Sequence, residues 1–331
     1  MKRIFQLLLL LGIIFSPFFT HAHVKWFTEV APLKESIENI LSPLFILLAI
    51  IAAIALALLA IIIPKTTEWS TIKKIDKRLS SLRKYSRNIL KYGTAVSLII
   101  QVSNGTLFAP EFLLENTSII VLVWVIIGLL LIPHHIPTKL GAVLLLGLFV
   151  FITIDNGIFH MLDYGFYVAI IGVLLVGNTK LEDIGFPFLY LGTGLSLCWV
   201  AVEKWVYPAM TLDIVASHSV PTFGFPPDAF IVMAAFIEFV VGYLLVVGIL
   251  NRVLGFVVTV IFIMTTMLFG MTEIIGHFMI HIVLIVFIIE GVSFYNPPIK
   301  MHNTKVDQFI FVFLNFIFVL ATFVLIYYRF A

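Results

Sequence analysis

The sequence predicts an all-α, polytopic membrane protein of about ten transmembrane helices, arranged as two tandem four-helix bundles with one extra helix at each end. Hydrophobic residues make up 61% of the 331 residues and charged residues only 11%, which leaves too little polar surface to cover a soluble globule. Apolar runs of about 20 residues, the length that spans a bilayer, recur along the chain. The basic residues are concentrated in one loop, as expected where they orient membrane helices.

Residues 1–22 have the features of a secretory signal peptide. Two basic residues precede a short apolar stretch, and small residues occupy the positions before a plausible cleavage point. Cleavage there would make His23 the N-terminus of the mature protein, whereas the alternative is an uncleaved membrane anchor. Residues 23–39 are polar and amphipathic. We expect them to lie outside the cytoplasm, with the protein in the plasma (inner) membrane.

The distribution of charge predicts the topology of the helices. The first transmembrane helix is expected at residues 40–63, and the basic loop that follows it, residues 64–91, is assigned to the cytoplasm by the positive-inside rule. Such a charge run is usually a solvated face or a contact with lipid headgroups, and no nucleic-acid partner is expected. Further spans are expected near residues 92–109, 118–133, 139–155, 164–178, 187–206, 228–250, 253–272, 276–293 and 306–328.

Residues 92–178 and 187–293 resemble each other, which indicates an internal repeat. The segment GTAVSLIIQVSNGTLFAP, which begins at Gly93, aligns with GTGLSLCWVAVEKWVYP, which begins at Gly192. The alignment predicts two four-helix units in the same orientation, a parallel repeat of a kind found in membrane proteins. It requires an insertion after Pro208 in the second unit.

Two carboxylates in apolar helices are the candidate catalytic residues, because a charge in hydrocarbon is costly and calls for a functional explanation. Glu238 lies near the middle of its helix and needs a partner or a cavity. A protonated Glu238 that hydrogen-bonds across the bundle, with a purely structural role, is an equally good interpretation. Glu203 is adjacent to Lys204, so the two side chains point to different partners. Because Lys204 can extend to the headgroups, Glu203 is the better functional candidate of the two.

Three side chains spaced by four residues form a candidate metal site. On a continuous helix Glu273, His277 and His281 project from one stripe and offer oxygen and nitrogen ligands to a transition metal. A pair of helical histidines is more often a hydrogen-bonded core pair. The metal interpretation gains support from His160, which is expected at the same external end.

His23 adds a second kind of metal ligand. An N-terminal histidine presents both its amine and its imidazole to one ion, a chelate suited to copper, and a third nitrogen would complete the coordination. Copper is therefore the favoured metal.

The second four-helix segment also carries a family pattern. Its first helix ends in Lys204 with Pro208 after it, its second carries Glu238-x3-Gly242 and ends in Gly248-x3-Arg252, and its fourth carries His281 and closes on Gly291. On these residues the segment 192–291 resembles the DoxX-like family of four-helix membrane proteins, and the first segment resembles it loosely. The resemblance implies a role in electron transfer, as in subunits of thiosulfate:quinone oxidoreductase, with quinone or a periplasmic or membrane redox partner.

Three functions are consistent with these patterns. The first is a membrane protein that binds or handles a transition metal at an outward-facing Glu/His site, in redox chemistry or metal homeostasis. The alternative is a quinone-linked oxidoreductase subunit, in which Glu203 and Glu238 relay protons and His281 binds a quinone carbonyl. A small-solute transporter is less well supported, because polar residues scarcely reach the cytoplasmic side. All three embed the chain in the lipid bilayer.

Overall fold

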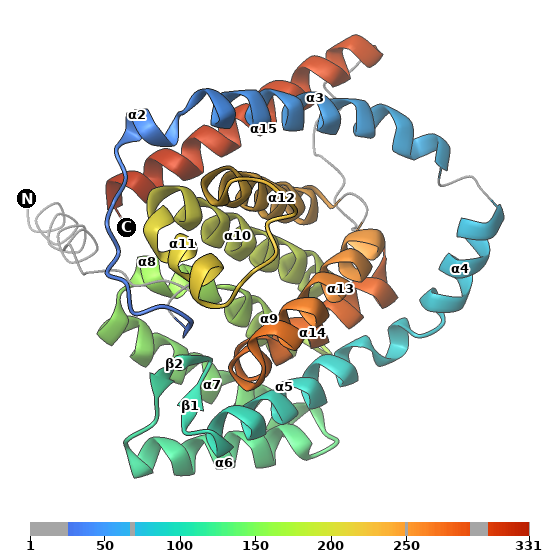
Figure 1. Ribbon diagram of the computed structural model, residues 1–331. Coiled ribbons are helices and arrows are strands. Elements are labelled where there is room, and N and C mark those ends of the chain that lie inside the picture. Colours follow the sequence, from blue (N-terminus) through green and yellow to red (C-terminus); the bar gives the residue numbers. More distant parts are fainter. Residues whose placement is uncertain (1–25, 67–69, 249–250, 292–303, 331) are drawn as a thin grey trace, which may run out of the picture.

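The computed structural model describes residues 26–66, 70–248, 251–291 and 304–330, and these residues are almost entirely helical (Figure 1). The predicted signal peptide and His23 lie outside the described residues. Each of the ten segments expected to span a membrane contains a helix. These helices are α3 (Pro43–Thr66), α5 (Ser86–Ser103), α6 (Thr117–Leu131), α7 (His135–Asn156), α9 (Phe166–Val176), α10 (Gly185–Val206), α12 (Pro227–Val247), α13 (Asn251–Phe269), α14 (Met271–Glu290) and α15 (Lys305–Phe330).

Most of these helices have the length and composition of membrane spans. Within the described residues, seven are long and apolar enough to cross a membrane. An eighth is added if residues 158–164 and α9, which meet at a bend of 66°, form one broken span. Helix α6 is apolar but has only 15 residues, and α5 begins with charged and polar turns. The structure therefore agrees with a multi-pass helical membrane protein.

Short elements connect the long helices. They are α2 (Ile37–Ile40), α4 (Ser70–Ser80), β1 (Thr106–Leu107), β2 (Ala109–Leu113), α8 (Ile158–Met161), α11 (Pro208–Ser217) and three 3-10 turns at Arg83–Tyr85, Leu162–Tyr164 and Glu182–Ile184. The helix expected at 92–109 stops at Ser103 because Gly105 has a positive φ of 72° and the chain turns into the antiparallel β1–β2 pair. Helix α11 occupies the place of the insertion expected after Pro208.

The helices of the two expected units pack as one series. Consecutive helices contact each other along the series α5, α6, α7, α9, α10, α12, α13 and α14, and the last of them, α14, contacts α5. The last helix of each unit therefore lies against the first helix of the other unit. Helices α3 and α15 pack side by side and lie against α12 and α10, as seen along the upper edge of Figure 1.

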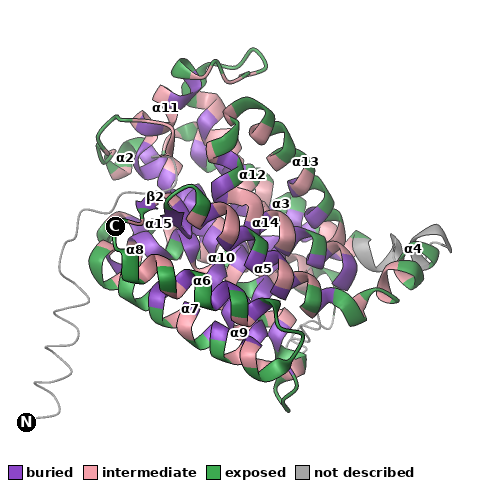
Figure 2. Cartoon of the chain, turned by 90° about the horizontal axis from the view of Figure 1, so that it is seen from below, coloured by how far each residue is buried: buried purple, intermediate pink, exposed green. Residues whose placement is uncertain are grey.

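Glycines lie at close contacts between helices. A Cβ at Gly93 of α5 would overlap Ile282 of α14, and a Cβ at Gly192 of α10 would overlap Ala169 of α9. The two glycines that align in the sequence thus occupy corresponding places in the packing. Buried residues are concentrated on the helices at these contacts, whereas α13 is largely exposed (Figure 2).

One arginine closes the C-terminal end of α14. The Arg252 guanidinium donates from Nε to the Ile288 carbonyl at 2.6 Å and from Nη2 to the Ile289 carbonyl at 3.0 Å. Its Nη1 donates to Asp76 Oδ1 at 2.5 Å, which ties α4 to this end of the bundle. Gly291 has a φ of 76°, and a Cβ there would overlap the guanidinium. Arg252 thereby satisfies carbonyls that a helix end leaves without partners.

Candidate functional site

Two histidine–carboxylate pairs lie at the end of the bundle that is expected to be external. The first pair joins α8 to β2, with His160 Nε2 at 2.9 Å from Glu111 Oε1. The Tyr164 hydroxyl donates to the same carboxylate oxygen. His160 and Tyr164 are both buried, and the Glu111 side chain is 15% exposed. A single carboxylate therefore holds an imidazole and a phenol in fixed orientations.

The second pair lies on α14, which runs through Gly276 without a break. His277 Nδ1 is 2.9 Å from Glu273 Oε1, and Thr265 of α13 donates its hydroxyl to the same oxygen at 2.5 Å. Glu273 is 2% exposed. The His277 ring stacks on Phe262 with ring centroids 4.7 Å apart. One imidazole nitrogen thus lies within ion-pair distance of a carboxylate, and one face of the ring lies against an aromatic ring.

Trp26 connects the two pairs. Its Nε1 donates to the Tyr164 hydroxyl at 3.2 Å, and its ring lies 5.0 Å from the His277 ring, centroid to centroid. The indole can lie so close to α14 only because residue 276 is glycine, since a Cβ there would overlap the ring. We call this group the outer polar network. Its members are Trp26, Glu111, His160, Tyr164, Glu273 and His277.

Glu203 and Glu238, the two candidate catalytic carboxylates, lie in different surroundings. Glu203 is 1% exposed near the end of α10, within electrostatic range of the Tyr327 hydroxyl of α15. Glu238 of α12 forms an ion pair with Lys204 of α10, in which both side chains are partly exposed. Glu203 and Lys204 do point to different partners, as adjacent helical residues must.

In the described part of the chain, Glu203 and Glu238 do not join His277 and His281 in a group that could hold a metal ion. His281 lies one turn further along α14, at the edge of the Phe262 ring with centroids 5.9 Å apart. Across the described ranges, no three His, Cys, Asp or Glu side chains are close enough to hold a metal ion. His277 and His160 are instead each matched with a carboxylate.

Three members of the outer polar network were missed by sequence reasoning, namely Trp26, Glu111 and Tyr164. Glu111 lies 49 residues from His160 in a short polar stretch, so no helical spacing links the two. Trp26 is 138 residues from its partner Tyr164. The only signal in the sequence was a glycine within an apolar helix, Gly276, and an aromatic residue ahead of the first long apolar run, Trp26. Their relation becomes apparent only once the two are known to touch.

Comparison of the chain with protein-family models, curated proteins and solved structures gives no match. The resemblance to the DoxX-like family stays a prediction.

Proposed function

We propose that this is an integral membrane protein that binds a transition-metal ion, with copper favoured, at the outer polar network, and that it uses the ion in redox chemistry or metal homeostasis. The observation that carries the proposal is that two imidazoles each lie 2.9 Å from a carboxylate oxygen, His277 from Glu273 as an ion pair and His160 from Glu111 as a hydrogen bond. Metal-binding histidines nearly always have their second ring nitrogen bound to a carboxylate, a carbonyl or water, which fixes the ring and raises its basicity.

In this proposal the carboxylates orient the ligands. Glu273 is engaged by both His277 and Thr265, so its role changes from the expected metal ligand to a residue that positions His277. Glu111 has the same relation to His160. His281, one turn further along α14, is an additional candidate ligand for the ion.

His23 would complete the site. It precedes Trp26 by three residues, and three residues of extended chain span about 10 Å. Trp26 itself touches His277 and Tyr164. A mature N-terminus at His23 would therefore bring an amine and an imidazole within reach of the network, and nitrogen ligands of this kind suit copper.

The proposal is tested by copper binding to the mature full-length protein, purified in detergent without a metal-chelating tag. We expect about one copper per chain by elemental analysis. His277→Ala should abolish stoichiometric binding, and Glu273→Gln should weaken the affinity about 10-fold to 100-fold by releasing the imidazole. Insertion of one alanine before His23 should also abolish it.

His135→Ala is the matched control, because His135 is an exposed histidine outside the network. Unchanged copper stoichiometry in His277→Ala, or equal loss in His135→Ala, contradicts the proposal. N-terminal sequencing that finds a start other than His23 removes the amine ligand.

The alternative function, a quinone-linked oxidoreductase subunit, depends on Glu203. In that alternative Glu203 and Glu238 transfer protons, but Glu238 forms an ion pair with Lys204, so only the buried Glu203 is left for proton transfer. We infer in addition that the two four-helix units are a duplication of DoxX-like type in a plasma (inner) membrane. The corresponding places of Gly93 and Gly192 in the packing support it.

A further inference from the structure

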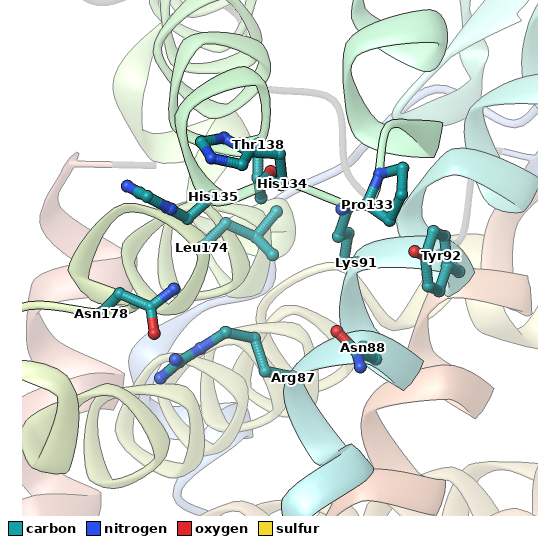
Figure 3. A pocket seen from close by; sticks show the side chains of 11 residues that line it. Arg87, Asn88, Lys91, Tyr92, Pro133, His134, His135, Thr138, Leu174 and Asn178 are labelled. Carbon is teal, nitrogen blue, oxygen red and sulfur yellow. The ribbon is translucent and has the colours of Figure 1, made fainter.

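A pocket of 220 Å³ lies at the end of α5, α6, α7 and α9, on the side of the bundle where the basic segment enters. Figure 3 shows Arg87 and Lys91 of α5 on one side of it, and His134 and His135 at the start of α7 on the other. The pocket is large enough for several water molecules at about 30 Å³ each, or for a small polar group of similar size.

Two of the residues that line the pocket, Arg87 and Lys91, are cationic, and none of the lining residues has a carboxylate. The Lys91 side chain is buried, at 5% exposed, and its Nζ donates to the Ile132 carbonyl at 2.6 Å. In the described part of the chain no Asp or Glu pairs with this ammonium group. A buried charge without a counter-ion is costly, so Lys91 favours an anion in the adjacent space.

Arg87 supplies a second charge. Its Nη1 donates to Glu182 Oε1 at 2.5 Å, and Glu182 is itself 43% exposed, so this charge is offset only in part. The Arg87 Nε is buried and has no hydrogen-bond partner among the described residues. An N–H donor in this state has unused capacity for an acceptor.

The remaining polar groups also favour an anion. Helix α7 begins at His135 beside the pocket, and a helix N-terminus carries a partial positive charge. The amide side chains of Asn88 and Asn178 line the same space and can donate to oxygen. Guanidinium, ammonium and amide donors around one space are the set that binds phosphate oxygens.

We propose that this pocket binds a phosphate group, supplied either by the headgroup of an anionic phospholipid or by a soluble phosphate. The phosphate oxygens accept from Lys91 Nζ and from the Arg87 guanidinium, and the first turn of α7 closes the third side.

The test compares thermal unfolding of the full-length protein in nanodiscs of phosphatidylcholine, in the same nanodiscs with inorganic phosphate, and in nanodiscs with added phosphatidylglycerol. Chloride is used to match ionic strength. We expect a rise in the unfolding midpoint, relative to zwitterionic phosphatidylcholine alone, in at least one of the two conditions that add an anionic phosphate. A rise with phosphatidylglycerol alone identifies the lipid as the source, and a rise with inorganic phosphate identifies a soluble ligand.

Lys91→Met keeps the length of the side chain and removes the charge. We expect it to be at least as stable as the wild type without phosphate, because it removes an unpaired buried charge, and to lose about tenfold or more of the phosphate affinity. Lys84→Met is the matched control, because Lys84 is an exposed basic residue of the same segment outside the pocket. It should respond as the wild type does.

His135→Gln provides a second test at an exposed lining position, should Lys91→Met fail to fold. It should weaken the response to phosphate while Lys84→Met does not. The absence of any response in the wild type, or an equal response in all the variants, overturns the proposal.

Discussion

Gly276 allows Trp26 to join the outer polar network. Helix α14 presents bare backbone at this position, and the Trp26 indole packs there between Tyr164 and His277. A glycine inside a helix costs about 1 kcal/mol relative to alanine. The contact with Trp26 gives a physical reason for that cost.

Gly276→Ala should therefore displace Trp26. Although alanine favours a helix, overlap with the indole should lower the free energy of unfolding by about 1 to 3 kcal/mol, measured by reversible unfolding in mixed micelles. Trp26 fluorescence should shift to the red as the ring meets water. Gly147→Ala is the control, because no atom lies within 4 Å of the added Cβ, and it should be neutral or stabilising. Equal stability of the two variants would count against the packing role.

At this scale the sequence predicted some contacts and missed others. The spacing of Glu273 and His277 predicted that they share a stripe of α14, because a helical period of 3.6 residues is a local property. Glu111 and Trp26 join the network through tertiary packing. Contacts between residues so far apart in the chain leave no periodic pattern in a single sequence. The buried position of Glu203 could be anticipated, but its neighbour Tyr327, 124 positions further along the chain, could not.

The pairing of α10 with α12 gives a packing role to Lys204, Glu238 and Gly242, three residues of the pattern on which the DoxX-like resemblance rests. A Cβ at Gly194 would overlap the Gly242 backbone, and a Cβ at Gly242 would overlap the Gly194 backbone and Cys198. The two helices thus cross at small residues, as membrane helices commonly do. Along the same interface Glu238 pairs with Lys204. Helices were predicted well because apolar runs are local, whereas the ion pair required knowledge of which helices touch.

A double-mutant cycle measures the ion pair. Lys204→Met leaves Glu238 without its cation, and we expect a loss of about 1 to 2 kcal/mol of unfolding free energy, less than for a fully buried pair because both side chains are partly exposed. Lys204→Met combined with Glu238→Leu should cost less than the sum of the single changes. Lys180→Met, at an exposed lysine, should be neutral. Strictly additive effects would mean that the pair contributes nothing.

At the scale of the whole molecule, the chain joins two four-helix groups through reciprocal contacts. Helix α9 packs on α10 as α14 packs on α5, and α3 with α15 lies against one side of this assembly. Hydropathy predicted ten helical segments, each of which contains a helix, and seven or eight spans in the described residues are long and apolar enough to cross a membrane. It did not predict that the two groups would share their interfaces, because the glycines that permit this are ordinary residues in membrane helices.

The predicted orientation is accessible to thiol labelling. The only cysteine, Cys198, is buried, so the wild type should not react with an impermeant maleimide. Phe225→Cys, in the loop between α11 and α12, should react in intact cells, whereas Lys180→Cys should react only after permeabilisation. The reverse pattern would invert the topology and place the outer polar network in the cytoplasm.

The shortness of α6 has a consequence for the surrounding lipid. Fifteen residues of α-helix extend about 22 Å, whereas a hydrocarbon core is about 30 Å thick. Val121, Trp124 and Val125 of this helix are exposed on its outer side. The bilayer next to α6 must become thinner locally, or another membrane protein with an equally short apolar surface must pack against this helix. The hydrophobic thickness of the protein would then be smaller on the α6 side than elsewhere. Its association with other membrane proteins would depend on membrane thickness as much as on the residues at the interface.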